Sequence, residues 1–201
     1  MPNRYWSDLH LGHRNIITYC NRPFESVGQH DETILLNWRL TAEAYPDDPV
    51  YCCGDVTLWN RATTTRVQES AVAKLALPKQ QLLVLGNHDS QWAQVNGHYD
   101  HLFERVIGDP FAIADFREMI WDGDRMVWLS HAPIEPHLLL GGLNLYGHIH
   151  NGYDTHPDRM DATYPWLRES QQHFNCSVER TGYRPVTLDE LRQLQAARGH
   201  P

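Results

Sequence analysis

The chain of 201 residues carries 17 lysines and arginines against 25 aspartates and glutamates, a net charge of −8, and 41% of it is hydrophobic. A chain of this size can bury a sizeable core, so we expect one globular domain over residues 1–201. The acidic balance argues against sequence-independent binding to duplex nucleic acid, which needs a field of basic side chains. The longest apolar runs fall far short of the ~20 residues that a membrane helix needs, and the N-terminus lacks the regions of a signal peptide.

The cysteine and histidine content limits the kinds of site that this chain can form. No CxxC pair occurs, so we expect reduced core thiols in a cytoplasmic protein. Histidine is enriched, with 13 residues and no poly-His run. Because histidine is the commonest metal ligand, the question is which histidines gather and which lie on the surface.

Strands and helices alternate along the first half, which favours an α/β layered fold. Residues 4–6 form the first expected strand. Ser26 followed by Gln29 is a capping-box pattern that opens a helix through residues 31–45. The next expected elements are a buried strand at 50–53, a helix at 62–77 and a strand at 81–85.

The second half begins with an expected hairpin, residues 111–121 and 125–130, turning at Gly123. Residues 151–174 show no clear period, and we expect a long loop there. Thr187 and Glu190 form another capping box, which predicts a C-terminal helix through residues 188–198. Two further expected strands are residues 144–146 and 174–179.

Five of the apolar strands end in polar residues of the same kinds. In chain order these ends are "SDLH" (7–10), "GDV" (54–56), "GNHD" (86–89), "SHAP" (130–133) and "GHIH" (147–150). Each residue by itself could simply cap a strand end. Because sites in open α/β sheets form beyond the carboxyl ends of the strands, all five ends can meet at one edge.

These ends offer two carboxylates, four imidazoles and one amide as metal ligands. That number is too large for one tetrahedral zinc and fits two adjacent divalent ions that share a carboxylate. Oxygen and nitrogen ligands without thiolate favour Mn²⁺, Fe²⁺, Co²⁺, Ni²⁺ or Zn²⁺, and we expect Mn²⁺ first. Two ions about 3.5–4 Å apart can clamp the attacking and leaving oxygens of a displacement at phosphorus. The candidate ligands are Asp8, His10, Asp55, Asn87, His131, His148 and His150.

In this order the five ends resemble the motif blocks of the calcineurin-like metallophosphoesterases, over residues 5–150. The resemblance implies a four-layer α/β/β/α sandwich of two mixed sheets flanked by helices. It also implies hydrolysis of phosphodiesters or phosphomonoesters through in-line attack by a hydroxide that bridges two metal ions. The segments "SDLHLGHRNIITYCNRPF" and "FNCSVERTGYRPVTLDEL" are similar to a small single-domain branch of uncharacterised phosphoesterases. One departure is "VTLWN" after "GD", where many members carry a further acidic or glycine residue.

Carried over by position, the resemblance assigns a role to each ligand. Asp8, His10 and His150 would bind the first metal, and Asn87, His131 and His148 would bind the second. Asp55 would bridge both. His88 would protonate the leaving oxygen or stabilise the charged transition state, with Asp89 orienting its ring. The alternatives are a supporting role for His88 and a helix cap for Asp89.

The roles of His13 and Arg22 remain open. The register of His13 does not match Asp8 and His10, so we expect it to lie on the substrate side or to support the site. Arg22 could hold a substrate phosphate by a bidentate contact, or be a surface arginine that forms a salt bridge with Asp or Glu. Three aromatic residues could stack on a base or anchor the core and loops: Trp59, Tyr153 and Trp166.

We expect a phosphate-ester substrate, either a nucleotide or another small phosphoester, without a strong nucleic-acid-binding surface and without a membrane. One alternative is a nuclease or a cyclic-nucleotide phosphodiesterase, which would need a basic or aromatic strip beside the site. The other is a catalytically silent binding module of the same fold. Such modules usually lose ligands, whereas all seven positions are filled in this chain.

Overall fold

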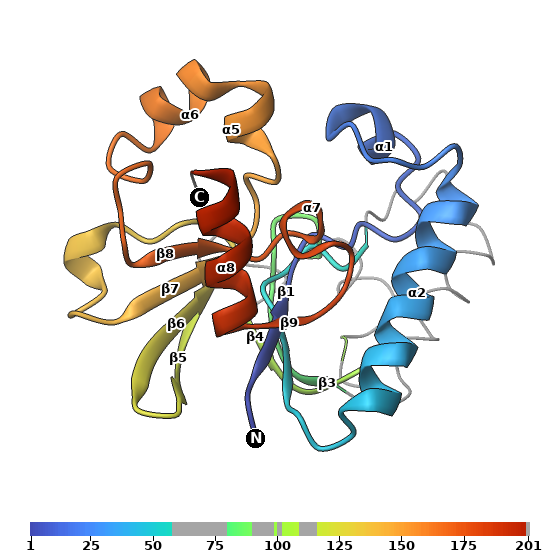
Figure 1. Cartoon of the computed structure of the whole chain (residues 1–201), viewed down its shortest axis with the longest axis horizontal. Coiled ribbons are helices and arrows are strands. Elements are labelled where there is room, and N and C mark those ends of the chain that lie inside the picture. The colour runs from blue at the N-terminus through green and yellow to red at the C-terminus, as the bar shows by residue number, and fades with distance from the viewer. Residues whose placement is uncertain (58–79, 90–98, 100–101, 109–115, 200–201) are drawn as a thin grey trace.

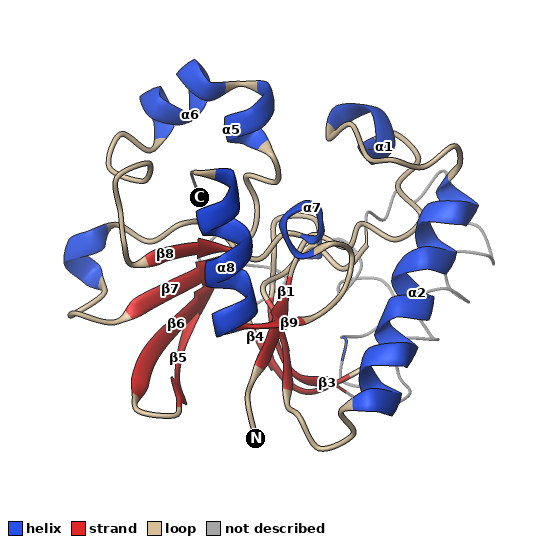
Figure 2. Ribbon diagram, viewed as in Figure 1, coloured by secondary structure: helices blue, strands red, loops and turns tan. Residues whose placement is uncertain are grey.

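The computed structural model describes residues 1–57, 80–89, 99, 102–108 and 116–199. The strands form two mixed sheets, with the orders β4-β3-β2-β1-β9 and β5-β6-β7-β8 (Figure 1). Helices flank these sheets (Figure 2). The predicted α/β fold with two mixed sheets and flanking helices is therefore confirmed.

The first sheet contains four parallel strands, and their carboxyl ends lie at one edge. The short β9 (Val186–Thr187) pairs antiparallel with the first of them and makes the sheet mixed. Because a parallel sheet repeats the same strand direction, whatever follows each strand gathers at one end. The parallel strands are β1 (Arg4–Trp6), β2 (Val50–Cys52), β3 (Gln80–Val84) and β4 (Phe103–Ile107).

The second sheet begins with the predicted hairpin of β5 (Arg117–Asp122) and β6 (Arg125–Ser130). Gly123 lies in the turn at φ +63°, a left-handed conformation that a hairpin turn of this length requires. The strands β7 (Leu143–Tyr146) and β8 (His173–Asn175) continue parallel to β6. Their carboxyl ends are directed toward the same region as those of the first sheet.

Two helices begin where their capping residues predict. Ser26 accepts a hydrogen bond from the Gln29 backbone N–H, and Thr187 and Glu190 form both halves of a capping box. Among the helices that the structure describes, none combines the length and apolarity needed to cross a bilayer. The helices are α1 (Ile16–Tyr19), α2 (Val27–Ala44), the 3₁₀ turn η2 (Pro136–Leu138), α5 (Gly152–Thr155), α6 (Pro157–Thr163), α7 (Val178–Thr181) and α8 (Leu188–Arg198).

The core forms layers because successive strand side chains point to opposite faces. On the outer face of the first sheet, Trp38 of α2 packs against Trp6 with ring centroids 5.7 Å apart. Between the sheets, Leu82 belongs to one buried cluster with Leu129 and Leu145. Full burial of one such side chain contributes about 1.5–3 kcal/mol, so these layers fix how the two sheets meet.

Some expectations for individual elements were wrong or lie outside the described residues. The stretch 151–174 is not a long loop, because it contains α5 and α6. These short helices pack around Tyr153 and Leu167, which join a small buried cluster and supply the stability that periodicity alone does not indicate. The strand β4 was not predicted. The predicted helix at 62–77 lies outside the described residues.

Candidate metal centre

The two sheets meet at their carboxyl ends, and the candidate ligands follow those ends directly. Asp8 comes two residues after β1, and its backbone N–H donates to the carbonyl of Gly54 at 2.9 Å. His131 immediately follows β6, and its carbonyl accepts from Gly147, one residue before His148. A bridge between Ser7 and Ser177 ties the edges of the two sheets together. All seven predicted ligands therefore lie in one region.

Five of these ligands have a left-handed backbone. Non-glycine residues in this conformation cost about 1–2 kcal/mol each, and such strain gathers at functional sites where the surroundings over-determine it. The sharp turn that each of these residues makes directs its side chain back toward the junction of the sheets. The residues and φ values are Asp8 (58°), His10 (50°), Asp55 (55°), His148 (67°) and His150 (50°).

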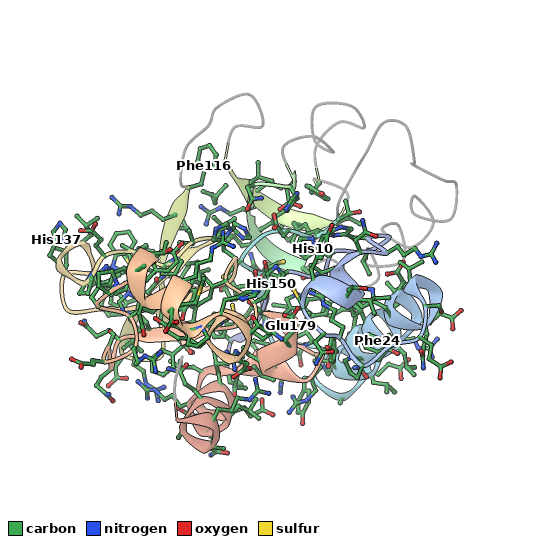
Figure 3. All side chains as sticks on the ribbon, turned by 90° about the horizontal axis from the view of Figure 1, so that it is seen from above. His10, Phe24, Phe116, His137, His150 and Glu179 are labelled. Atoms are coloured by element: carbon green, nitrogen blue, oxygen red, sulfur yellow. The ribbon has the colours of Figure 1, made fainter. Side chains whose placement is uncertain are left out.

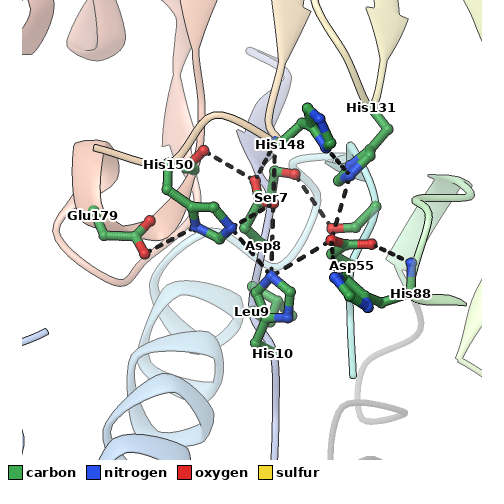
Figure 4. Close-up of polar contacts among 12 residues, drawn as sticks. Ser7, Asp8, Leu9, His10, Asp55, His88, His131, His148, His150 and Glu179 are labelled. Carbon is green, nitrogen blue, oxygen red and sulfur yellow. Dashed lines mark hydrogen bonds and ion pairs between the residues drawn. The ribbon is translucent and has the colours of Figure 1, made fainter. Parts of the chain in front are cut away.

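The first ligand set contains Asp8, His10 and His150. His150 Nε2 lies 3.3 Å from His10 Nε2 and 3.5 Å from Asp8 Oδ1 (Figure 4). Ligand atoms about 2.0–2.2 Å from a common ion lie roughly 3 Å from one another, so this spacing fits one ion. Figure 3 places His10 and His150 near each other at the centre of the face viewed from above.

The second ligand set contains Asn87, His131 and His148. Asn87 Oδ1 lies 2.9 Å from His131 Nε2 and 3.0 Å from His148 Nδ1. The two ring nitrogens are 3.3 Å apart. The amide oxygen of Asn87 and the two imidazole nitrogens thus converge on one point, as the ligand atoms of the first set do. These atom types fit a divalent transition metal.

Asp55 faces both sets. Its Oδ2 lies 3.5 Å from His10 Nε2 and 3.3 Å from His131 Nε2. Its Oδ1 accepts a hydrogen bond from the His88 backbone N–H at 2.9 Å. One oxygen is therefore anchored by the chain, and the other is directed toward the space between the two sets.

Two glycines make room for these carboxylates. A Cβ at Gly147 would collide with the carboxylate of Asp8 and the side chain of Ser7. A Cβ at Gly86 would collide with the carboxylate and backbone of Asp55. The glycines in "GNHD" and "GHIH" are therefore required by close approach of the ligands.

The electrostatics of the centre are dominated by burial and by opposite charges. Burial alone would raise the pKa of Asp55, but His131 and His10 hold it well below its usual range. Burial would lower the pKa of His131, yet the Asp55 carboxylate raises it to about 10. Burial lowers the pKa of His10 well below its usual value. The Asp55 carboxylate therefore remains ionised and is suited to a cation.

His88 and His13 border the open side of the centre. The His88 side chain is 37% exposed, and its Nε2 lies 3.9 Å from Asp55 Oδ2. The ring of His13 lies 5.5 Å from that of His10. Burial, and then His88, lower the pKa of His13 to about 4. Both rings stand beside the ligand sets, and their predicted roles stay predictions.

Asp89 lies in a different place from the one expected. Its carboxylate is fully buried. Both carboxylate oxygens accept hydrogen bonds from the loop that carries Asp55. The expectation that Asp89 orients the His88 ring is therefore contradicted. The two oxygens accept hydrogen bonds from the backbone N–H groups of Asp55 (2.7 Å), Val56 (2.9 Å) and Gly86 (2.9 Å), and from the hydroxyl of Tyr99 (2.9 Å).

We expect Asp89→Asn to lower the free energy of unfolding by about 1–3 kcal/mol and to weaken metal retention, because an amide N–H₂ would face backbone N–H donors. Urea denaturation and metal analysis would measure both effects. Tyr99→Phe, which removes a single hydrogen bond to Asp89, should cost less. If Asp89→Asn kept its stability and its metal content but lost turnover, the role of Asp89 in orienting the His88 ring would be supported after all.

Arg22 also requires a correction. Its guanidinium is buried, and all of its N–H groups are engaged by the chain, so it is not available to a substrate phosphate. The ion pair of the other option is present, with Glu179 as partner at 2.8 Å, but the expected surface position is wrong because both side chains are buried. Sequence reasoning did not identify Glu179, and the strand predicted at 174–179 was wrong at this residue, because β8 ends at Asn175 and Glu179 lies in α7. The remaining acceptors of Arg22 are the carbonyls of Asp8 and Leu9 and the ring of His30.

The aromatic candidates for base stacking serve as anchors where the structure describes them. Tyr153 is 4% exposed and belongs to the small cluster on the outer side of the second sheet. The ring of Trp166 packs 4.7 Å from that of His173. Trp59 lies outside the described residues. Neither described ring therefore faces the metal centre as a stacking platform.

This chain is similar to known proteins in sequence and in fold. The family model for calcineurin-like phosphoesterases matches residues 6–196. An uncharacterized protein of Methanocaldococcus jannaschii, MJ1445, is 28% identical over 188 residues, which are 94% of this chain and 88% of that protein. The crystal structure of a protein of unknown function from Aquifex aeolicus, AQ665, has a TM-score of 0.62 at 22% identity, over 96% of this chain and 98% of the other. The structural similarity supports the fold.

Proposed function

The chain belongs to the calcineurin-like phosphoesterase family, and from this premise we propose that it hydrolyses phosphate esters with the help of two divalent metal ions. The observation that carries the proposal is the position of Asp55 Oδ2, within 3.5 Å of a ring nitrogen from each ligand set. A single oxygen between two convergent sets is the arrangement that a pair of ions sharing one carboxylate needs.

Each ligand has a place in the proposal. Asp55 would contribute to both ion sites, and Mn²⁺ is the proposed metal, with Fe²⁺, Co²⁺, Ni²⁺ and Zn²⁺ as alternatives. When bound, the ions polarise the phosphate oxygens and lower the pKa of a bound water so that it can attack phosphorus. Asp8, His10 and His150 would hold the first ion, and Asn87, His131 and His148 would hold the second.

The chain's own side chains complete the reaction. His88, exposed beside the ligand sets, would donate a proton to the departing oxygen of the ester. His13 would lie on the substrate side of His10. Two ions of about +4 in total outweigh the two carboxylates of Asp8 and Asp55, so the centre attracts phosphate although the whole chain is acidic.

The test is hydrolysis of bis-p-nitrophenyl phosphate and p-nitrophenyl phosphate by the purified protein. We expect the chelated protein to be inactive and added Mn²⁺ to restore turnover. Cyclic nucleotides and single-stranded DNA in the same assay would separate the phosphodiesterase and nuclease alternatives from a general phosphoesterase. Absence of turnover with every ester and every transition metal would overturn the proposed function and favour a silent binding module.

A further inference from the structure

Two segments far apart in the sequence meet beneath the first ligand set. Arg22 lies in the loop between α1 and α2, and Glu179 lies in α7, 157 residues later. The Arg22 side chain is 0% exposed and the Glu179 side chain 5%. Glu179 Oε1 accepts from Arg22 Nε at 2.8 Å and lies 2.7 Å from Arg22 Nη2. The two side chains of such a buried ion pair stay in one geometry because neither charged group can exchange its partner for water.

The same oxygen of Glu179 also contacts a ligand histidine. His150 Nδ1 lies 3.1 Å from Glu179 Oε1, on the side of the ring opposite to the nitrogen that faces Asp8 and His10 (Figure 4). A carboxylate in this position fixes the tautomer with Nδ1–H, so that the Nε2 lone pair is directed toward the ion. It also increases the basicity of the ring as a ligand.

This contact distinguishes the first set from the second. The outer nitrogen of His131 meets a neutral group, the carbonyl of Cys53 at 2.8 Å. The outer nitrogen of His10 is buried without a hydrogen-bond partner among the described residues. Of the ligand histidines in the described part of the chain, His150 is the one whose outer nitrogen is held by a carboxylate.

Arg22 connects this carboxylate to the other ligands of the first set. Its Nη2 donates to the carbonyl of Asp8 at 2.8 Å, and its Nη1 donates to the carbonyl of Leu9 at 3.1 Å. The segment that carries Asp8 and His10 is thereby tied, through one guanidinium, to the group that holds His150.

A second layer supports Arg22 from α2. Arg22 Nη1 lies 2.6 Å from His30 Nε2, and His30 Nδ1 lies 2.8 Å from Asp31 Oδ1. Asp31 in turn accepts from the backbone N–H of Gly12 at 3.0 Å. The chain of contacts therefore returns to the segment that follows His10, so Arg22 is held from both sides.

We propose that Glu179, clamped by Arg22, is a positioning residue that orients His150 and thereby sets the affinity of the first ion site selectively over the second. The inference rests on the proposed function, because it requires that the ligand sets bind ions. Glu179 reaches the ion only through His150, so it is not itself a ligand in this proposal. Loss of such a supporting carboxylate typically weakens metal affinity about 10–100-fold.

The experiment is a calorimetric titration of the metal-free protein with Mn²⁺, followed by electron paramagnetic resonance. The wild type should bind two ions and, when filled, show the signal of a spin-coupled pair. In Glu179→Gln we expect one binding step to weaken about 10–100-fold while the other stays close to wild type. At Mn²⁺ levels that fill the wild type, the variant should then show a single uncoupled ion.

The matched control is Glu135→Gln, which removes the partner of His137 in an exposed pair 3.2 Å long. It should leave both binding steps unchanged. Glu179→Asp keeps a negative charge at this position but draws the carboxylate back from both His150 and Arg22, which share Glu179 Oε1. It should fold and show an intermediate loss at the same step, so it decides the question if Glu179→Gln does not fold.

The outcomes separate the two proposals. Equal weakening of both steps, or unchanged binding in Glu179→Gln and Glu179→Asp, would overturn the positioning role alone. Wild-type protein that binds two ions but hydrolyses no ester would overturn the proposed function and leave the positioning role standing. Wild-type protein that binds no ion would overturn both.

Discussion

Replacing Asp55 with Asn is expected to remove bound metal and to lower turnover by roughly 10³-fold or more. Asp55 Oδ2 lies close to both candidate ligand sets, at 3.5 Å from His10 Nε2 and 3.3 Å from His131 Nε2. An amide loses the negative charge between the ions and offers only one oxygen, which is also needed by the His88 backbone N–H. Loss of several kcal/mol of charge stabilisation corresponds to this change in rate.

Metal analysis of the purified variant and turnover of bis-p-nitrophenyl phosphate with added Mn²⁺ would measure the effect of Asp55→Asn. The control is Asp161→Asn, the same change at an exposed carboxylate paired with Arg168. The control should keep its metal and its activity. If Asp55→Asn retained two ions and near-normal turnover, Asp55 would not be the bridging ligand.

Replacing His88 with Ala is expected to lower turnover about 10²–10⁴-fold without loss of metal. The ring lies beside the centre but 3.9 Å from Asp55 Oδ2, and its backbone N–H, which anchors Asp55, is kept in the variant. A general acid matters most for a leaving group that departs poorly without a proton. The loss should therefore be larger for an alkyl ester than for a p-nitrophenyl ester.

The measurement for His88→Ala is turnover of both ester types, together with metal content and folding. His137→Ala, at a histidine whose side chain is 70% exposed, serves as the control and should leave every quantity unchanged. An equal loss for good and poor leaving groups would show that His88 stabilises charge without donating the proton. Loss of metal would instead make His88 part of the ion site.

The fold was predictable wherever local patterns specify it. Apolar runs marked β2 and β3, and the capping residues Ser26 and Thr187 marked two helix starts, because these signals act within a few residues. The strand β4 was missed because Glu104 and Arg105 interrupt its apolar pattern, and pairing with β3 stabilises it instead. The helices α5 and α6 depend on packing around Tyr153 and Leu167, which no local period indicates.

The residues of the site were predictable for a different reason. Within each sheet the polar ends of parallel strands lie at one edge, and the resemblance of the five motifs to the family implied that the two edges meet. Their left-handed backbones were not foreseen, since these depend on the hydrogen bonds that surround each turn. The direction of the Asp89 carboxylate was wrong for the same reason, because its partners come from another strand end.

Local patterns in a fixed order were sufficient to predict the class of the fold, the family and the kinds of ligand atom that can gather at the ends of the strands. The roles of Arg22 and Glu179, by contrast, depend on the tertiary structure. Arg22 was compatible with a substrate phosphate or with an ion pair until its burial and its partner 157 residues away were known. Supporting contacts of this kind join distant segments, and their energy depends on burial, which no local spacing specifies.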